Sequence, residues 1–172
     1  MDVRRFRGSF WLPHEKASEA GQMNDIRERY WNFFNTINSQ VEAVRGGPGM
    51  DLADINKIKN RSYQIYRMEI YLRDYRAKHA HPWESLTGVR AAHHRILAKF
   101  HWPIPAIEML TVEQIFFALH DDIANHPIGP AAEQALANYG FPDMPTGDSL
   151  QGFLEKEWLP EIAARLLPKA HL

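Results

Sequence analysis

The chain contains no cysteine. Disulfide bonds, thiolate nucleophiles and every zinc or iron–sulfur site built from cysteine ligands are therefore excluded. The sequence also lacks the long apolar run that a membrane-spanning helix needs, and the short apolar cluster Phe10-Trp11-Leu12 does not reach the length of a secretory signal. We therefore expect a cytoplasmic protein with no membrane association.

Two common catalytic motifs are also missing. Neither Gly-x-Ser-x-Gly, which presents a nucleophilic serine, nor Gly-x-x-x-x-Gly-Lys, which cradles phosphates, occurs in the chain. The glycine cluster at 46–49 follows one predicted helix and precedes another, with no strand before it, which is typical of a turn.

What the chain does have is an uneven distribution of charge. Its formal net charge is only −1, yet residues 51–100 contain ten Lys/Arg and five Asp/Glu, whereas residues 101–172 contain three and ten. The basic stretch also contains four of the nine histidines, with a fifth at position 101 directly after it, and many aromatic residues. Cations bind phosphates and aromatic rings stack on bases, so this mixture is typical of a nucleic-acid surface. Alternatively, the basic residues form the solvated face of long helices packed against an acidic C-terminal half.

The spacing of apolar residues predicts a single all-α domain over residues 1–172 of about six helices. One helix is expected from Met23 to Val44, and a second from Asp51 to about Ala80, which together form a long helical hairpin. Pro82 ends the second helix, because the residue before proline avoids helical geometry. A third helix is expected from about Glu84 to Phe100, followed by a loop over 101–105.

The C-terminal half is predicted to contain shorter helices. Thr111-Val-Glu-Gln114 is a capping box that would open a helix reaching Ile123. Pro130 suits the first position of a short helix ending at Gly140. Ser149 would cap a final helix that carries Leu150, Phe153, Leu154 and Trp158, and Pro160 would bend or restart it before Ile162, Leu166 and Leu167. Residues 1–21 are expected to form an extended N-terminal segment and lead-in.

The end of the second predicted helix contains a short motif. Arg76-Ala-Lys-His-Ala-His81 has an arginine, four intervening residues and a histidine. This motif resembles the signature of the HEPN superfamily of helical-bundle proteins, in which an arginine is followed after four to six residues by a histidine, often preceded by alanine. The chain differs from that signature at Ala77, where a polar residue is usual.

The resemblance implies metal-independent RNA cleavage, in which the ribose 2′-hydroxyl attacks the adjacent phosphate. His81 would then be the general base or acid, and Arg76 would stabilise the developing negative charge. The resemblance also implies a homodimer that completes the site, and it implies no cofactor.

We therefore predict a nucleic-acid-associated protein that prefers RNA to DNA, with endoribonuclease activity at Arg76 and His81. The basic side chains expected to contact nucleic acid are Lys57, Lys59, Arg61, Arg67, Arg73 and Lys78. Alternatively, the chain is a non-enzymatic binding module or an immunity-type interaction factor. In that case its acidic C-terminal half would bind a basic protein partner, or its two charged halves would drive self-assembly.

Two further site types are weighed and set aside. His120, Asp121, Asp122 and His126 are potential metal ligands, but Asn125-His126-Pro127 is typical of a helix C-terminus, where a histidine interacts favourably with the helix dipole. We therefore predict no metal. The helix after Pro130 could belong to a helix-turn-helix, but its only charged residue is Glu133, which does not suit a DNA-reading helix.

Overall fold

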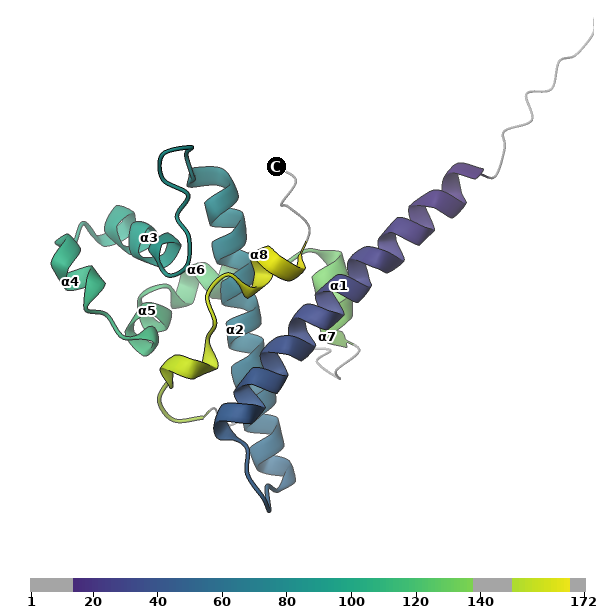
Figure 1. Cartoon of the computed structure of the whole chain (residues 1–172), viewed down its shortest axis with the longest axis horizontal. Helices are drawn as coiled ribbons and strands as arrows, with labels where there is room; N and C mark the ends of the chain where they lie inside the picture. The colour runs from purple at the N-terminus through teal and green to yellow at the C-terminus, as the bar shows by residue number, and fades with distance from the viewer. Residues whose placement is uncertain (1–13, 138–149, 168–172) are drawn as a thin grey trace, which may run out of the picture.

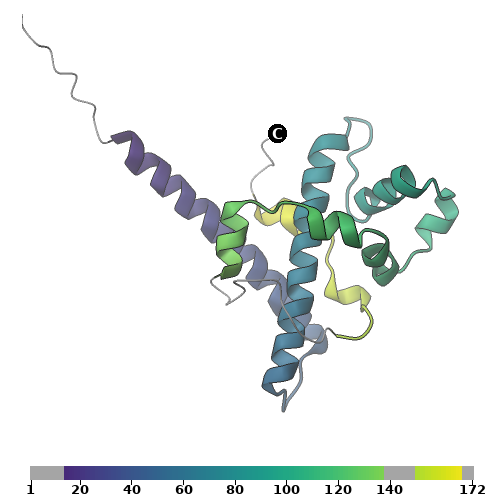
Figure 2. The same ribbon diagram turned by 180° about the vertical axis from the view of Figure 1, so that it is seen from behind.

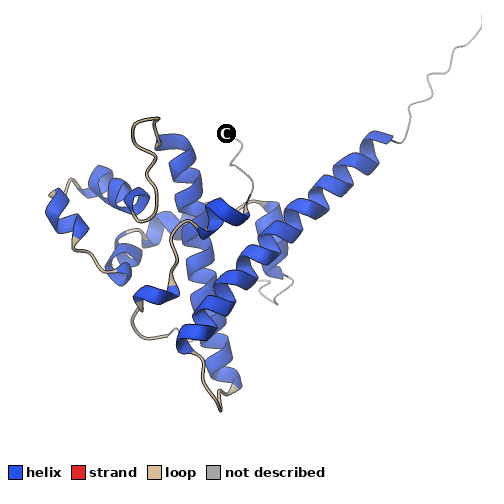
Figure 3. Ribbon diagram, in the orientation of Figure 1, coloured by secondary structure: helices blue, strands red, loops and turns tan. Residues whose placement is uncertain are grey.

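The computed structural model describes residues 14–137 and 150–167. Within these ranges the chain forms eight α-helices and one short 3-10 helix, with no strand (Figure 3). The prediction of an all-α fold is confirmed, with more helices than the expected six and with short helices in the C-terminal half. None of the helices in the described ranges combines the length and apolar character needed to cross a membrane.

The two long helices are α1 (His14–Arg45) and α2 (Leu52–His79). The glycine-rich turn between them contains Gly49 at a φ of +88°, a backbone conformation that favours glycine. Asp51 caps α2 by accepting a hydrogen bond from the backbone N–H of Asp54 at 2.9 Å. The predicted helical hairpin is therefore present, and its two helices contact each other and then diverge (Figure 1).

The first half of α1 projects away from the rest of the molecule (Figure 1). Its apolar stripe is buried from Tyr30 to Val41, but Met23, which continues the same stripe, is 51% exposed. Residues 14–21, which were expected to belong to an extended lead-in, are already helical, and the expected extended conformation of residues 1–13 lies outside the described residues.

Helix α2 is the central element of the fold. It contacts α1, α3, α6 and α8, so it is surrounded on several sides rather than packed along a single stripe. Its buried residues accordingly include polar and charged side chains, namely Arg61, Ser62, Glu69 and Arg76. A buried charge needs partners, and these partners determine much of the geometry described below.

The helix predicted from Glu84 begins later, and α3 spans Arg90–Phe100. Leu86 and Gly88 have φ angles of +52° and +57°, and this left-handed geometry interrupts the helix before it can begin. The expected loop over 101–105 is partly wrong, because the short helix α4 (Ile104–Glu108) starts there.

The helix predicted to run from Thr111 to Ile123 is two helices, α5 (Val112–Ala118) and α6 (His120–Asn125). The capping box at Thr111 and Gln114 is present as predicted. The chain turns at Leu119, and this turn allows α5 to contact α3 while α6 contacts α2. These elements and α4 gather on the side of α2 opposite the projecting end of α1 (Figures 1 and 2).

The C-terminal region differs most from expectation. Helix α7 (Pro130–Ala137) starts at the predicted proline and lies beside α1 (Figure 2), whereas its predicted end at Gly140 and the cap at Ser149 lie outside the described residues. The final helix predicted over Leu150 to Trp158 is wrong. Residues 150–154 are not helical, and only the 3-10 helix η1 (Glu155–Glu157) and α8 (Ile162–Leu166) follow.

Candidate functional site

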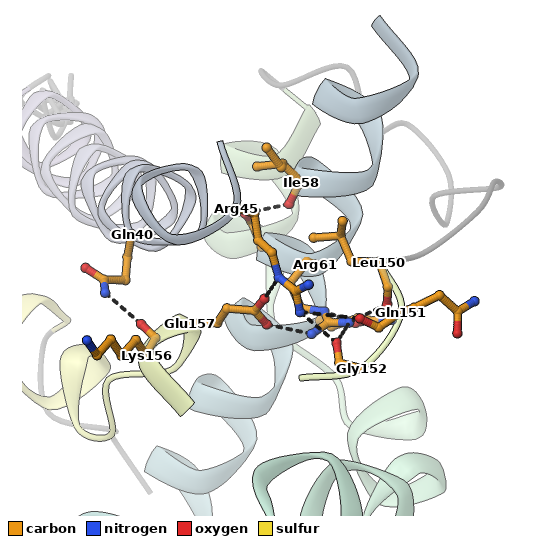
Figure 4. A network of polar contacts seen from close by, with 11 residues as sticks. Gln40, Arg45, Ile58, Arg61, Leu150, Gln151, Gly152, Lys156 and Glu157 are labelled. Carbon is orange, nitrogen blue, oxygen red and sulfur yellow. Dashed lines mark hydrogen bonds and ion pairs between the residues drawn. The ribbon is translucent and has the colours of Figure 1, made fainter. Parts of the chain in front are cut away.

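Arg61, which was expected to contact nucleic acid, lies inside the protein with its side chain 4% exposed. Its Nη1 donates a hydrogen bond to Oε2 of Glu157 at 2.6 Å (Figure 4). Its Nη2 donates to the carbonyl oxygens of Leu150 and Gly152 at 2.7 and 2.9 Å. Burial lowers the pKa of Arg61, and the negative charge of Glu157 opposes that effect. This guanidinium therefore attaches the C-terminal segment to α2.

The same carboxylate also binds α1. Arg45 donates to Oε1 of Glu157 and to the carbonyl oxygen of Gly152, and the Glu157 side chain is fully buried (Figure 4). Gln40 adds a hydrogen bond to the carbonyl oxygen of Lys156 at 2.7 Å. These bonds hold residues 150–154 in a non-helical conformation, because the backbone carbonyls point to the arginines. The sequence analysis missed this network, since Arg61 and Glu157 are 96 positions apart.

Arg67 and Arg73, two further residues of the expected nucleic-acid surface, also have internal partners. Arg67 donates to the carbonyl oxygens of Ile123, Ala124 and His126 at the end of α6, at 3.2, 3.0 and 2.7 Å. Arg73 donates to the hydroxyl oxygen of Tyr30 at 3.0 Å and pairs with Asp74 at 2.7 Å. Both arginines therefore serve the packing of α2 against its neighbours.

The three lysines of the expected surface lie nearer to solvent. Lys57 is 3.5 Å from Asp54, an interaction within the first turns of α2. Lys59 is half-buried and Lys78 is exposed in the last turn of α2. Of the six residues expected to contact nucleic acid, Lys78 is thus the most accessible.

Arg76 is buried, with 9% of its surface exposed. Its Nη1 lies 3.5 Å from the carbonyl oxygen of Gly88, and its Nη2 is a buried donor without a hydrogen-bond partner. Its positive charge acts on Glu69, which is also buried and accepts hydrogen bonds from Trp158 Nε1 at 2.7 Å and from the backbone N–H of Ala163 at 3.2 Å. Arg76 therefore sits beneath the loop that joins α2 to α3.

His81 has the opposite environment. It is exposed in the loop after α2, where its backbone pairs with that of Glu84. Its ring stacks on Trp83 with centroids 4.8 Å apart and planes within 1° of parallel, and Trp83 is 81% exposed. The structure therefore separates Arg76 and His81 into an interior and a surface position, and the pair is not assembled as a single site within this chain.

A tyrosine–histidine group that the sequence analysis missed lies close to this loop. The hydroxyl of Tyr75 is 2.8 Å from Nδ1 of His94, and the ring of His79 packs against Tyr75 with centroids 4.3 Å apart and planes tilted by 30°. Burial lowers the pKa of His79, and the neighbouring positive charges of Lys78 and the other basic groups lower it further. Only the packing of α3 against α2 brings His94 to Tyr75, so no local sequence signal could reveal the pair.

The potential metal ligands on α6 have other partners. Asp122 accepts hydrogen bonds from Arg95 at 3.0 Å and from Lys99 at 3.2 Å. Burial favours a raised pKa for Asp122, but these bonds outweigh it and hold the pKa below its ordinary value. His126 Nε2 lies 2.9 Å from Asp74. Across the described ranges, no group of three or more His, Asp or Glu side chains is arranged to hold a metal ion.

Comparisons of the chain with protein-family models, with curated proteins and with solved structures found no match.

Proposed function

We propose that this protein binds single-stranded RNA through the loop between α2 and α3, with His81 and Trp83 as a base-stacking platform. The proposal rests on one observation: the rings of His81 and Trp83 stack with their planes parallel, and Trp83 is 81% exposed. Exposed aromatic faces stack on unpaired bases irrespective of sequence, and this stacking is a main source of affinity in single-strand binding.

Cationic side chains near the platform support the same proposal. Lys78 is exposed in the last turn of α2, and the side chain of Arg90, at the start of α3, is 65% exposed although it pairs with Glu84. Both side chains are exposed enough to approach phosphates that flank a stacked base. The preference for RNA over DNA, the homodimer and the cytoplasmic location expected from the sequence belong to the same proposal.

Cleavage of the bound RNA is the chemical extension of this proposal. His81 carries an accessible imidazole, which suits a general base that takes the 2′-hydroxyl proton while the 5′-oxygen leaves the phosphate and a 2′,3′-cyclic phosphate forms. Arg76 contributes to this reaction only when the loop over 80–89 uncovers it. RNA binding is therefore the primary function that we propose. Cleavage would require the imidazole of His81, and Arg76 would take part only after the loop has moved.

The test uses end-labelled single-stranded RNA in the presence of EDTA at two salt concentrations. Trp83→Ala should weaken binding about 5- to 150-fold, which corresponds to the loss of about 1–3 kcal/mol of stacking. Trp102→Ala, which removes another exposed tryptophan, should leave RNA affinity unchanged. Equal RNA affinity of wild type and Trp83→Ala, or no binding by wild type, would refute the proposal.

Catalysis is measured separately, at protein concentrations that saturate the RNA. Wild-type cleavage that disappears in His81→Ala would establish the enzymatic role of His81. Salt-sensitive binding without cleavage in either protein would leave a binding module.

A further inference from the structure

A groove of about 830 Å³ lies between the end of α3, α5 and the start of α6, away from the RNA platform proposed above. Its aromatic lining consists of Phe100, Trp102 and Phe117. The rings of Phe100 and Trp102 stack with centroids 5.2 Å apart, so they form one continuous apolar wall.

The exposure of these rings is unusual for a helix surface. On α5, Ile115 is 1% exposed and faces the core, whereas Phe117 is 86% exposed, and Trp102 is 41% exposed. Ile104 and Met109, on and just after α4, are also exposed, at 57% and 83%. Ile104 and Met109 do not line the groove, whereas the exposed rings of Trp102 and Phe117 do. Exposed apolar groups gathered in one groove are typical of binding surfaces.

Charge at the edge of the groove indicates the partner. Glu113 and Asp121 line it with exposed carboxylates, and neither forms an ion pair within the described part of the chain. The one lysine of the lining, Lys99, is already 3.2 Å from Asp122 and lies over the Phe100 ring. Carboxylates and aromatic faces both attract cations, and carboxylates repel phosphates.

We propose that this groove binds a segment of a partner protein that carries both apolar and Lys/Arg side chains. The apolar side chains pack on Phe117 and on the Phe100–Trp102 wall, and the cations pair with Glu113 and Asp121. RNA and anionic membranes do not suit the groove, because their phosphates would meet these carboxylates.

The experiment selects binders for the full-length chain from a library of random displayed peptides and measures the affinity of the enriched peptides. Sequences that combine apolar residues with Lys/Arg should be enriched. Phe117→Ala and Trp102→Ala should each weaken the selected peptides about tenfold or more, as expected for aromatic anchors. Both side chains are exposed enough for the fold to survive, which circular dichroism checks. Glu113→Lys together with Asp121→Lys should also reduce affinity and reverse its salt dependence.

The matched control is Trp83→Ala, which should bind the peptides like wild type. No enrichment, enrichment of acidic peptides, or affinity unchanged by Phe117→Ala would overturn the proposal, as would competition for the groove by RNA or by vesicles of anionic lipid. Because Trp83 serves only the RNA platform and Trp102 only the groove, failure of one proposal is distinguishable from failure of the other.

Discussion

Glu157 is the residue at which three distant parts of the chain meet. Its fully buried carboxylate accepts hydrogen bonds from Arg45 of α1 and Arg61 of α2, and Arg61 also holds the carbonyls of residues 150 and 152. Removing one member of such a network leaves buried charges without compensation, and that loss costs far more than an exposed ion pair contributes.

We therefore predict that Glu157→Gln lowers the free energy of unfolding by about 3–5 kcal/mol, since the buried guanidinium of Arg61 and the partly buried guanidinium of Arg45 lose their shared carboxylate. Urea unfolding followed by circular dichroism measures this change. Glu155→Gln, an exposed position on the same 3-10 helix, should change stability by less than about 0.5 kcal/mol. Similar effects of the two substitutions would show that the network contributes little.

Glu69 gives a prediction about pH. Burial raises the pKa of Glu69 above its ordinary value of 4.5, and the hydrogen bond from Trp158 and the charge of Arg76 oppose this only in part. The folded protein therefore binds more protons than the unfolded chain above about pH 4.5, and stability falls as the pH rises through the raised pKa.

In urea titrations across this pH range, the stability of wild type relative to Glu69→Gln should decrease as the pH rises. Glutamine cannot ionise, so the comparison isolates the titration of Glu69. A stability difference that is constant or grows with pH would contradict the prediction.

At the scale of elements, local signals determine where several helices begin. Pro130 opens α7, and Thr111 with Gln114 forms the capping box of α5, both as the sequence predicts. Helix α2 begins after Asp51 as expected, and the structure adds that Asp51 caps it. These signals involve residues only a few positions apart. The same contacts therefore form wherever the helix forms, whatever packs around it.

Thr111→Ala should lower the free energy of unfolding by about 1 kcal/mol, because the N–H of Gln114 loses its side-chain acceptor. Thr111→Ser keeps the hydroxyl and should remain close to wild type. Chemical denaturation of the three proteins measures the difference, and an equal loss in both variants would point to packing of the threonine methyl group instead of the cap.

Helix ends and breaks that depend on distant contacts escape the same reasoning. The late start of α3 follows from left-handed geometry at Leu86 and Gly88, and the non-helical 150–154 segment follows from the arginines that bind its carbonyls. Apolar periodicity alone favours a helix in both places, because it contains no information about these partners.

At the scale of the whole molecule, the separation of basic and acidic residues along the sequence does not produce an equal separation of charge on the protein surface. Arg61 pairs with Glu157, and Arg95 and Lys99 pair with Asp122, so parts of the basic stretch and of the acidic half neutralise each other within one chain. Among the described residues, the two surfaces that we propose for partners are the platform at His81 and Trp83 with Lys78, and the acidic aromatic groove at α5.

The projecting half of α1 yields a prediction about proteolysis. Residues there have few tertiary contacts, and Asp25, Glu28 and Arg29 are exposed, so local unfolding should require little free energy. The first tryptic cleavage among the described residues should occur within this half of α1, after Lys16, Arg27 or Arg29, and leave a folded fragment that begins inside α1, which mass spectrometry identifies. First cleavage after Arg61 or Arg76 would show that α2 opens more readily than α1.

The sequence by itself determined the all-α class, the helical hairpin, the caps and the absence of cysteine chemistry, because these depend on composition and on neighbours within a few turns. Tertiary structure alone decided which charges are free. Arg76 and His81 are five positions apart in the sequence, yet one lies beneath the α2–α3 loop and the other on it. The reason is that α2 is packed on several sides, and burial of a side chain depends on all the elements around it, which no local spacing specifies.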